Sequence, residues 1–282
     1  MNQIVGINQG AVMQTRLEPF LHACHRYGVR EVELRAPKII EALYHLAPQE
    51  LQERLAQAEV TVTAVNSLDD FALVPDENLS MLEREAQTMA YICDVVQCDL
   101  VVAPVGRWFD PKPVAWEWVR QRSAQRLQVI ERVLADHNIR IGVEPIAFPN
   151  FTVTSLEGAM EIISEAGSRN AVLIADVYNL MLGSSTPDSM RALAQQIGMI
   201  HVNDSPHRRG AELDVMFTRL FPQEGVLNPK EWVQLAWEGG YTGPVSLEIF
   251  MKSLWEDNPD AALKLCAEKA AAFAADLEQL KR

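Results

Sequence analysis

The chain has 282 residues, of which 48% are apolar and 22% are charged, and its formal net charge at pH 7 is −13. This composition is ordinary for a soluble globular protein. A nucleic-acid-binding protein presents a basic face to phosphate groups, so the acidic balance argues against DNA or RNA as a partner. The length suits one large α/β barrel, and we expect a single domain over residues 1–282.

Cysteine usage and hydropathy indicate the compartment. The four cysteines are scattered and form no C-x-x-C pair, which is typical of reduced, buried thiols in a cytoplasmic protein. The first residues contain neither a basic region nor an apolar run of signal-peptide length. No segment approaches the roughly 20 apolar residues of a membrane span. We therefore expect a cytoplasmic protein that does not contact a membrane.

Strand-like runs alternate with amphipathic segments along the whole chain. Strands are predicted at residues 3–7, 29–34, 60–65, 99–105, 139–145, 171–177, 198–205 and 245–250. Helices are predicted at residues 16–27, 37–59 with a break at Pro48, 78–97, 113–137, 155–166, 187–196, 229–237 and 259–280. This alternation favours a parallel sheet closed into a (β/α)8 TIM barrel. An open doubly wound sheet is the alternative, but the first strand is not followed by the glycine-rich turn G-x-G-x-x-G.

Each of the last four predicted strands places one ionisable side chain between two apolar neighbours. These side chains are Glu144, Asp176, His201 and Glu248. Because side chains alternate between the two faces of a strand, each ionisable group points away from the face that its neighbours share. A lone ionisable group on a buried face is costly unless it is paired or binds a metal. Strand ends meet at the C-terminal mouth of a barrel, so we predict that the four converge on one ion.

The types of ligand indicate the metal. Three carboxylates and one imidazole suit Mn²⁺ or Mg²⁺ and are acceptable to Co²⁺ or Zn²⁺. The alternative is a set of separate ion pairs with lysine or arginine. The shared position of these groups on four adjacent strands favours the metal site.

These segments resemble the xylose-isomerase-like barrel superfamily, which includes tagatose-type epimerases and inosose-handling enzymes. The resemblance is carried by Gly142-Val143-Glu144-Pro145, Ala175-Asp176-Val177-Tyr178-Asn179, His201-Val202-Asn203-Asp204, Gly225-Val226-Leu227 and residues 240–248. It implies that Glu144, Asp176, His201 and Glu248 are the metal ligands. It also implies that Glu144 and Glu248 exchange a substrate proton from opposite faces, and it allows a homo-oligomer.

Five residues are candidates for binding the substrate. Arg35, Arg107 and Arg208 stand at or just beyond strand ends, where arginine can bind a carboxylate or phosphate through paired hydrogen bonds. Pairing with surface acids is the alternative for each. The resemblance adds Asn179, where many family members have a histidine. It also adds His207, where some relatives have an arginine, as a candidate general acid, with a solvated loop residue as the alternative.

These residue types fit proton transfer next to a carbonyl group. A divalent ion that binds a carbonyl and an adjacent hydroxyl stabilises the enediolate. One carboxylate then acts as base and the other as acid. We therefore predict a metal-dependent isomerase or epimerase that acts in carbohydrate metabolism on a small sugar or hydroxy-keto compound.

Three alternatives remain at this stage. The first is a dehydratase acting on an inosose or a 3-dehydroshikimate-like substrate, because the same residues serve the loss of a β-hydroxyl. The second is a barrel that binds metal or ligand without turnover. The third, the nuclease branch of the superfamily, uses several more histidines and is disfavoured by the acidic charge.

Overall fold

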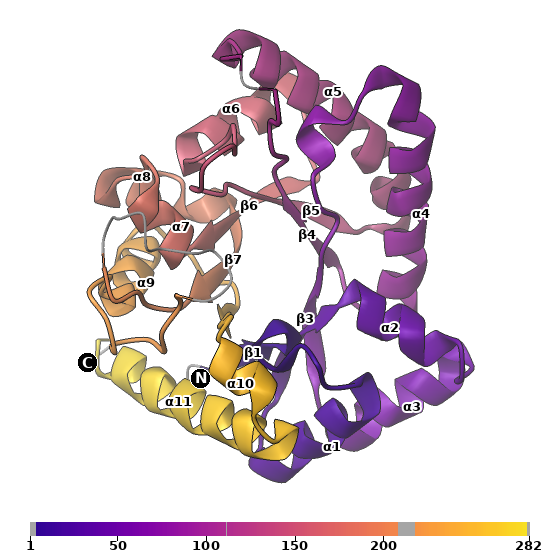
Figure 1. Cartoon of the computed structure of the whole chain (residues 1–282), viewed down its shortest axis with the longest axis vertical. Coiled ribbons are helices and arrows are strands. Elements are labelled where there is room, and N and C mark those ends of the chain that lie inside the picture. The colour runs from indigo at the N-terminus through magenta and orange to yellow at the C-terminus, as the bar shows by residue number, and fades with distance from the viewer. Residues whose placement is uncertain (1–3, 111, 208–217, 281–282) are drawn as a thin grey trace.

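The structure is a computed structural model that describes residues 4–110, 112–207 and 218–280. Eight parallel strands form a closed barrel in which each strand pairs with its neighbours in sequence and β8 pairs with β1 (Figure 1). The strands are β1 (Val5–Asn8), β2 (Glu31–Arg35), β3 (Thr61–Asn66), β4 (Leu100–Pro104), β5 (Arg140–Glu144), β6 (Ala171–Asp176), β7 (Ile197–Val202) and β8 (Val245–Leu247). The predicted TIM barrel is confirmed.

Helices surround the ring of strands (Figure 1). They are α1 (Leu17–Tyr27), α2 (Ala36–Leu43), α3 (Pro48–Ala58), α4 (Leu79–Val96), α5 (Trp116–Leu134), α6 (Leu156–Ala166), α7 (Val177–Leu182), α8 (Pro187–Ala192), α9 (Pro229–Glu238), α10 (Lys252–Glu256) and α11 (Pro259–Gln279). No helix within the described residues combines the length and the apolar character that crossing a membrane requires.

The observed elements differ from the predicted ones at the mouth of the barrel. The break at Pro48 is confirmed, since α3 begins there. The sequence did not predict α7 or α10, which have six and five residues and are too short to show a helical period. Strands β7 and β8 end earlier than predicted, at Val202 and Leu247. The residues that follow them stay buried, and Glu248 N still donates a backbone hydrogen bond to Val202 O at 3.2 Å.

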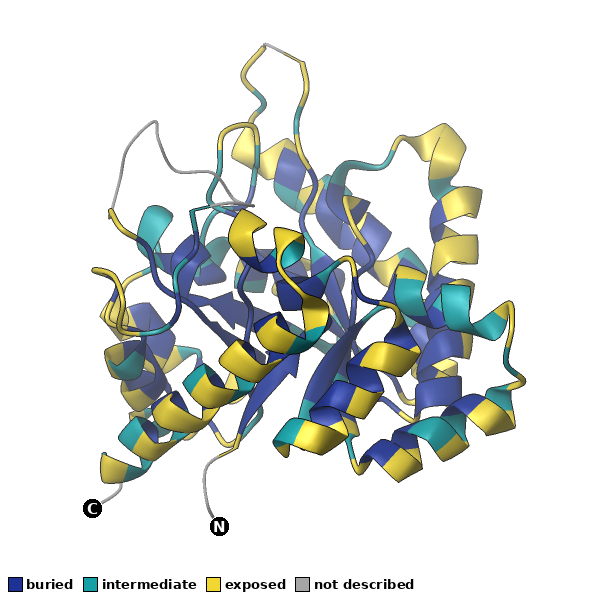
Figure 2. Cartoon of the chain, turned by 60° about the horizontal axis from the view of Figure 1, so that its bottom comes forward, coloured by how far each residue is buried: buried dark blue, intermediate teal, exposed yellow. Residues whose placement is uncertain are grey.

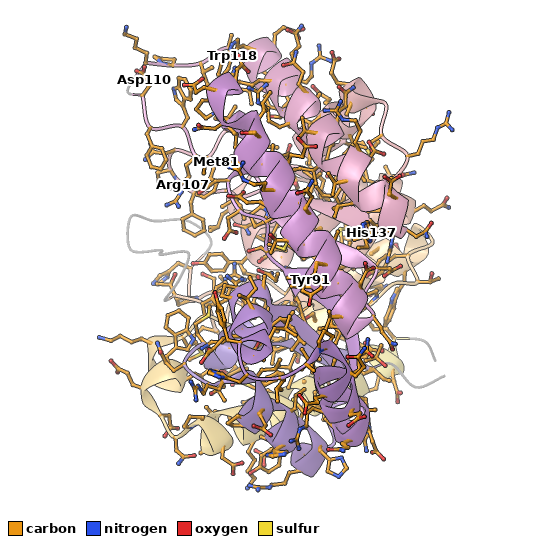
Figure 3. The ribbon with its side chains drawn as sticks, turned by 90° about the vertical axis from the view of Figure 1, so that its right-hand side faces the viewer. Met81, Tyr91, Arg107, Asp110, Trp118 and His137 are labelled. Carbon is orange, nitrogen blue, oxygen red and sulfur yellow. The ribbon has the colours of Figure 1, made fainter. Side chains whose placement is uncertain are left out.

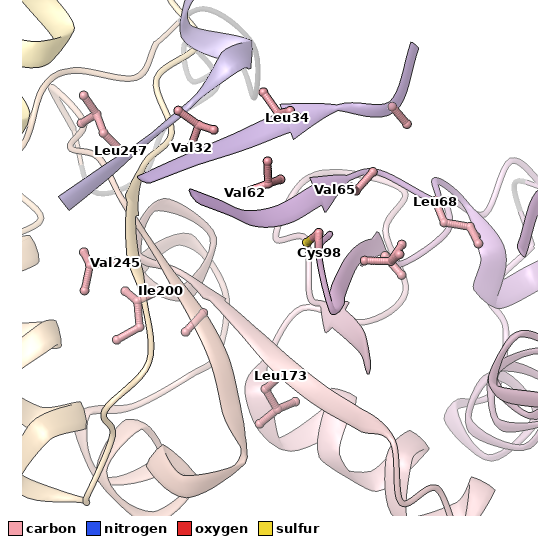
Figure 4. Close-up of a cluster of buried hydrophobic side chains, with 14 of the residues drawn as sticks. Val32, Leu34, Val62, Val65, Leu68, Cys98, Leu173, Ile200, Val245 and Leu247 are labelled. Atoms are coloured by element: carbon pink, nitrogen blue, oxygen red, sulfur yellow. The ribbon is translucent and has the colours of Figure 1, made fainter. Parts of the chain in front are cut away.

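The main core lies between the strands and the surrounding helices. The strands and the inward faces of the helices are buried, while the outer helix faces are exposed (Figure 2). Residues from several strands meet in this core, among them Val32, Val65, Leu173 and Ile200 (Figure 4). Such strands are buried on both faces, which explains their nearly continuous apolar sequence.

A second, smaller cluster fills the barrel interior. It consists of the buried side chains Ala64, Leu100, Val102, Ile174 and Met199. Gly142 makes room for this cluster, because a β-carbon at that position would lie 2.4 Å from Ile174 Cδ1. The polar residues described below stand above this apolar floor.

Candidate metal centre

Four ionisable side chains from β5, β6, β7 and the residue after β8 come together at the mouth of the barrel. They are Glu144, Asp176, His201 and Glu248, and one potential ligand atom from each lies within 4.8 Å of the others. Asp176 and His201 are fully buried, and Glu144 and Glu248 are each 3% exposed. The structure thus places the four predicted ligand residues at one point.

The register of the strands explains this convergence. Asp176 on β6 pairs with His201 on β7, and His201 pairs with Ser246 on β8. Glu248 follows Ser246 by two residues and therefore faces the same side, one layer nearer the mouth. Ile174 and Met199 precede Asp176 and His201 by two residues and belong to the apolar floor. The floor closes the barrel beneath the site, so a ligand enters from the mouth.

The carboxylate of Asp176 has one oxygen held by hydrogen bonds and the other directed toward the site. Asp176 Oδ1 accepts hydrogen bonds from the backbone N–H groups of Tyr178 at 2.7 Å and Asn179 at 3.2 Å, because Asp176 caps the N-terminus of α7. It also accepts from Asn203 Nδ2 at 3.1 Å. Asp176 Oδ2 is buried and has no hydrogen-bond partner. This oxygen is the one available to a cation.

Glu248 is held in the same way. Its Oε1 accepts hydrogen bonds from Asn8 Nδ2 at 2.9 Å and from Asn66 Nδ2 at 3.4 Å. Its Oε2 faces the site and lies 3.3 Å from His201 Nδ1. Glu144 Oε1 lies 3.5 Å from the same ring nitrogen. His201 Nδ1 therefore points toward both glutamates.

The other ring nitrogen of His201 faces Glu33 on β2. His201 Nε2 lies 3.1 Å from Glu33 Oε2, and Glu33 is fully buried. The same carboxylate accepts hydrogen bonds from Asn66 Nδ2 at 2.7 Å and Ser246 Oγ at 3.1 Å. A carboxylate next to Nε2 fixes the imidazole ring and keeps the proton on Nε2, which leaves Nδ1 free to bind a metal.

A second cation enters the cluster from the loop between β7 and α9. Arg219 is 2% exposed, and its Nη1 lies 2.7 Å from Asp176 Oδ2 and 2.8 Å from Glu248 Oε2. The contact with Glu248 is a hydrogen bond, whereas the contact with Asp176 is a charge contact without hydrogen-bond geometry. Nη1 also donates to the backbone oxygen of Glu248 at 3.2 Å.

Burial and neighbouring charges separate the acids into two groups. Burial raises the pKa of Glu144, and it raises the pKa of Glu248 to about 8 despite the opposing charges of His201 and Arg219. Burial acts in the same direction on Asp176, but Arg219 and His201 outweigh it and leave the pKa below its ordinary value. Two carboxyl groups with raised pKa values next to a strongly acidic one can hold and release protons.

His201 and Glu33 stabilise each other's charge. Burial lowers the pKa of His201, but the charges of Glu248 and Glu33 outweigh it and hold the pKa well above its ordinary value. Burial raises the pKa of Glu33, but the charge of His201 and hydrogen bonds from His201, Asn66 and Ser246 leave it below its ordinary value.

The donor set fits one divalent ion. Four buried carboxylates, from Glu33, Glu144, Asp176 and Glu248, lie around His201 and Arg219. The excess of negative charge in the described part of the cluster favours a bound cation. His201 Nδ1 and Asp176 Oδ2 are buried without hydrogen-bond partners, and Asp176 Oδ2 has only its charge contact with Arg219, which is costly unless another group satisfies them. Three oxygens and one nitrogen suit Mn²⁺ or Mg²⁺ and are accepted by Zn²⁺.

A cavity of about 310 Å³ lies above these residues, and its lining includes Glu144, Glu248 and Arg219. Two of the predicted mouth arginines also line it. Arg35 donates from Nη1 to Asn66 Oδ1, and its Nε is buried without a partner. Arg107 is half-exposed and lies 3.5 Å from Asp70 Oδ2. Figure 3 shows Arg107 on the loop after β4, on the same side of the molecule as Asp110.

The remaining predicted substrate-binding residues lie elsewhere or outside the described residues. Asn179 is buried in α7, where its Oδ1 accepts from the backbone N–H of Ala147 at 3.3 Å. His207 is exposed on the loop after β7, and its backbone oxygen accepts from Ser205 Oγ at 2.7 Å. Arg208 lies outside the described residues. The structure therefore brings Arg35 and Arg107, but neither Asn179 nor His207, to the lining of the cavity.

Several residues of the site were not predicted from the sequence. Asn8 and Asn66 are the polar last residues of β1 and β3, so their positions at strand ends were a usable signal. Glu33 lies inside β2 and has the same pattern of apolar neighbours as the four ligands. Arg219 gave no signal, because it belongs to a long loop whose path the sequence does not define. The loop is fixed there by mutual backbone hydrogen bonds of 2.8 Å between Asp204 and Leu220.

Known proteins resemble this chain over nearly its whole length. A family model described as xylose isomerase-like TIM barrel matches residues 21–277. The inosose isomerase of Halalkalibacterium halodurans is 23% identical over 264 residues, which cover 91% of each chain. The solved structure of the IolI protein with a bound zinc atom has a TM-score of 0.89 at 20% identity and covers 99% of each chain. The structure of an L-ribulose 3-epimerase has a TM-score of 0.76 at 16% identity, over 99% of this chain and 96% of that chain.

Proposed function

The chain belongs to the xylose isomerase-like TIM barrel family, and from this premise we propose that it is a divalent-metal-dependent isomerase or epimerase of a small sugar or inosose. The observation that carries the proposal is the cluster of Glu144, Asp176, His201 and Glu248, whose ligand atoms lie within 4.8 Å of one another. The similarity to an inosose isomerase supports the choice of substrate class.

The four residues would hold the ion through Glu144 Oε1, Asp176 Oδ2, His201 Nδ1 and Glu248 Oε2. A bound divalent ion supplies stabilisation of the negative charge that develops on a carbonyl oxygen when a proton leaves the adjacent carbon. Hydroxyl and carbonyl oxygens on neighbouring carbons of the substrate suit such a site.

Glu144 and Glu248 would move the substrate proton. Both line the cavity, and burial raises the pKa of each carboxyl group, which favours uptake of a proton by a carboxylate base. Their surroundings differ. Glu248 receives hydrogen bonds on both oxygens, from Asn8 on Oε1 and Arg219 on Oε2. The Glu144 carboxylate lies 3.5 Å from His201 Nδ1.

The cavity suits a small polar substrate. A volume of about 310 Å³ is at the lower end of the range for ligand sites and accommodates a single six-carbon ring or open-chain sugar. Ser67, Asp69 and Asn66 supply hydrogen-bonding groups to its lining, and Phe151 and Phe250 supply apolar surface. Sugars present this combination of polar edges and apolar faces.

The proposal is tested by metal analysis and isotope exchange. The purified protein should bind one Mn²⁺, Co²⁺ or Zn²⁺ per chain and lose activity on chelation. Incubation in D₂O with inososes and ketoses should place deuterium on the carbon next to the carbonyl. Glu144→Gln and Glu248→Gln should each lower turnover by about 10²- to 10⁴-fold with the fold intact.

Glu53→Gln is the matched control, because Glu53 is an exposed glutamate on α3 and should be dispensable. Bound metal without deuterium exchange on any substrate would favour a binding protein over an enzyme. Loss of water from an inosose or from 3-dehydroshikimate, without isomerisation, would identify a dehydratase instead.

A further inference from the structure

We propose that Arg219 is a built-in counter-cation that competes with the divalent ion for Asp176 and Glu248 and thereby weakens metal binding. This inference rests on the proposed metal site. It predicts that the ion is exchangeable and that the metal affinity of the protein is set by a residue that is not itself a ligand.

The contacts of Arg219 fall on the oxygens that a metal needs. Its Nη1 lies 2.7 Å from Asp176 Oδ2 and 2.8 Å from Glu248 Oε2. These are the oxygens directed toward His201 and Glu144, and they are the ones not held by neutral donors. A cation that binds the same two oxygens must share them with the guanidinium group or displace it.

The two carboxylates do not need Arg219 to keep their orientation. Asp176 Oδ1 is fixed by two backbone N–H groups and by Asn203, and Glu248 Oε1 is fixed by Asn8 and Asn66. Removal of the guanidinium charge therefore leaves two oriented oxygens with free lone pairs. For this reason we infer that Arg219 opposes the metal and does not assist it.

Arg219 is firmly placed. Its guanidinium carbon lies 5.2 Å from the centre of the Tyr178 ring and 4.8 Å from that of the Phe250 ring, distances at which aromatic rings attract a cation. The adjacent residue, Leu220, is fixed by its backbone hydrogen bonds to Asp204. The charge thus remains close to the ligand oxygens even if the metal displaces Nη1 from them.

The repulsion between this charge and the ion is substantial. Charges a few ångströms apart inside a protein interact by several times the thermal energy, even with partial screening. The positive charge of Arg219 also offsets part of the acidic cluster when the ion is absent, which stabilises the metal-free protein. One residue accordingly lowers metal affinity and preserves the fold without metal.

The test compares metal affinity in three variants of the full-length protein. The dissociation constant of Mn²⁺ or Zn²⁺ is measured by competition with a chelator of known affinity. We expect Arg219→Gln, which removes the charge but keeps a planar amide, to bind the ion about tenfold or more tightly than the wild type. Arg219→Lys, which keeps the charge, should bind within a fewfold of the wild type. Arg107→Gln is the control, since Arg107 lines the same cavity but pairs with Asp70 and contacts no ligand residue.

A second measurement uses the unaltered protein. The side-chain N–H resonance of Arg219 in ¹⁵N-labelled protein, assigned by its loss in Arg219→Lys, should shift when Zn²⁺ is added. Equal or weaker metal binding by a folded Arg219→Gln variant would overturn the competition while leaving the metal site in place. An Arg219 resonance unchanged by a bound ion would also overturn it. If neither the wild type nor any variant binds an ion, the proposed function fails as well.

Discussion

The carboxylate behind His201 offers the sharpest test of how the site is built. Glu33→Gln keeps the size of the side chain but replaces one acceptor oxygen by an NH₂ group. In the protein both oxygens of Glu33 act as acceptors, Oε1 from Asn66 and Oε2 from Ser246, with His201 Nε2 3.1 Å from Oε2. A glutamine cannot reproduce this arrangement, because its NH₂ group must face at least one of these donors.

The structure gives the expected size of the effect. One buried donor left without an acceptor costs about 1–3 kcal/mol in the free energy of unfolding. For a protein of this length, each kcal/mol lowers the melting temperature by roughly 2–4 °C. Loss of the carboxylate also frees the His201 ring to rotate or change tautomer, and such second-layer changes typically lower metal affinity by about 10- to 100-fold.

The assay is a chelator-competition measurement of metal affinity together with thermal unfolding, on Glu33→Gln and the wild type. Glu31→Gln is the matched control, because Glu31 starts the same strand and lies at the opposite end of the barrel. The Co²⁺-loaded protein adds a spectroscopic readout, since a reoriented imidazole changes the visible absorption of the ion. A folded Glu33→Gln variant with unchanged metal affinity and Co²⁺ spectrum would refute the role assigned to Glu33.

Two further predictions concern the rest of the fold. Gly225→Ala should lower the free energy of unfolding by about 1–3 kcal/mol in urea titrations, because its β-carbon would lie 2.2 Å from Ser205 O in the loop that carries Arg219; unchanged stability would contradict the packing of this loop. The four cysteines are buried, and burial raises the pKa of Cys24 and Cys266, so dithionitrobenzoate should react with no thiol of the native protein within minutes and with all four in guanidinium chloride. Rapid reaction of any native thiol would show that its segment opens locally.

The sequence was sufficient for the barrel because its strands and long helices carry strong periodic signals. Strands such as β5 and β6 are bounded by polar residues and contain nearly continuous apolar runs. The short helices α7 and α10 could not be predicted, because a single turn or two contains too few residues for a period to emerge. Helix α7 exists because Asp176 caps it, and that cap is recognised only once the strand end is known.

The candidate ligands were predictable because each depends only on its own strand. The alternation of side chains places Glu144, Asp176, His201 and Glu248 inside the barrel without any knowledge of the loops. Arg219 depends instead on how a long loop folds back across the mouth, and that path is set by tertiary contacts such as the hydrogen bonds between Asp204 and Leu220. A charge pair between distant segments leaves no local pattern in a single sequence.

The candidate ligands and the residues that hold them in place come from opposite sides of the ring of strands. Within the described residues, every candidate ligand lies on or directly after a strand of the arc β5 to β8. Asn8, Glu33 and Asn66, on β1, β2 and β3, instead form hydrogen bonds or ion pairs that orient those ligands. Substitutions on β1 to β3 can therefore change the basicity of the candidate ligands and their affinity for a cation, while the ligand residues themselves are kept. A barrel organised in this way can diverge toward new substrates by gradual substitution on β1 to β3 while the candidate ligand residues of β5 to β8 are kept.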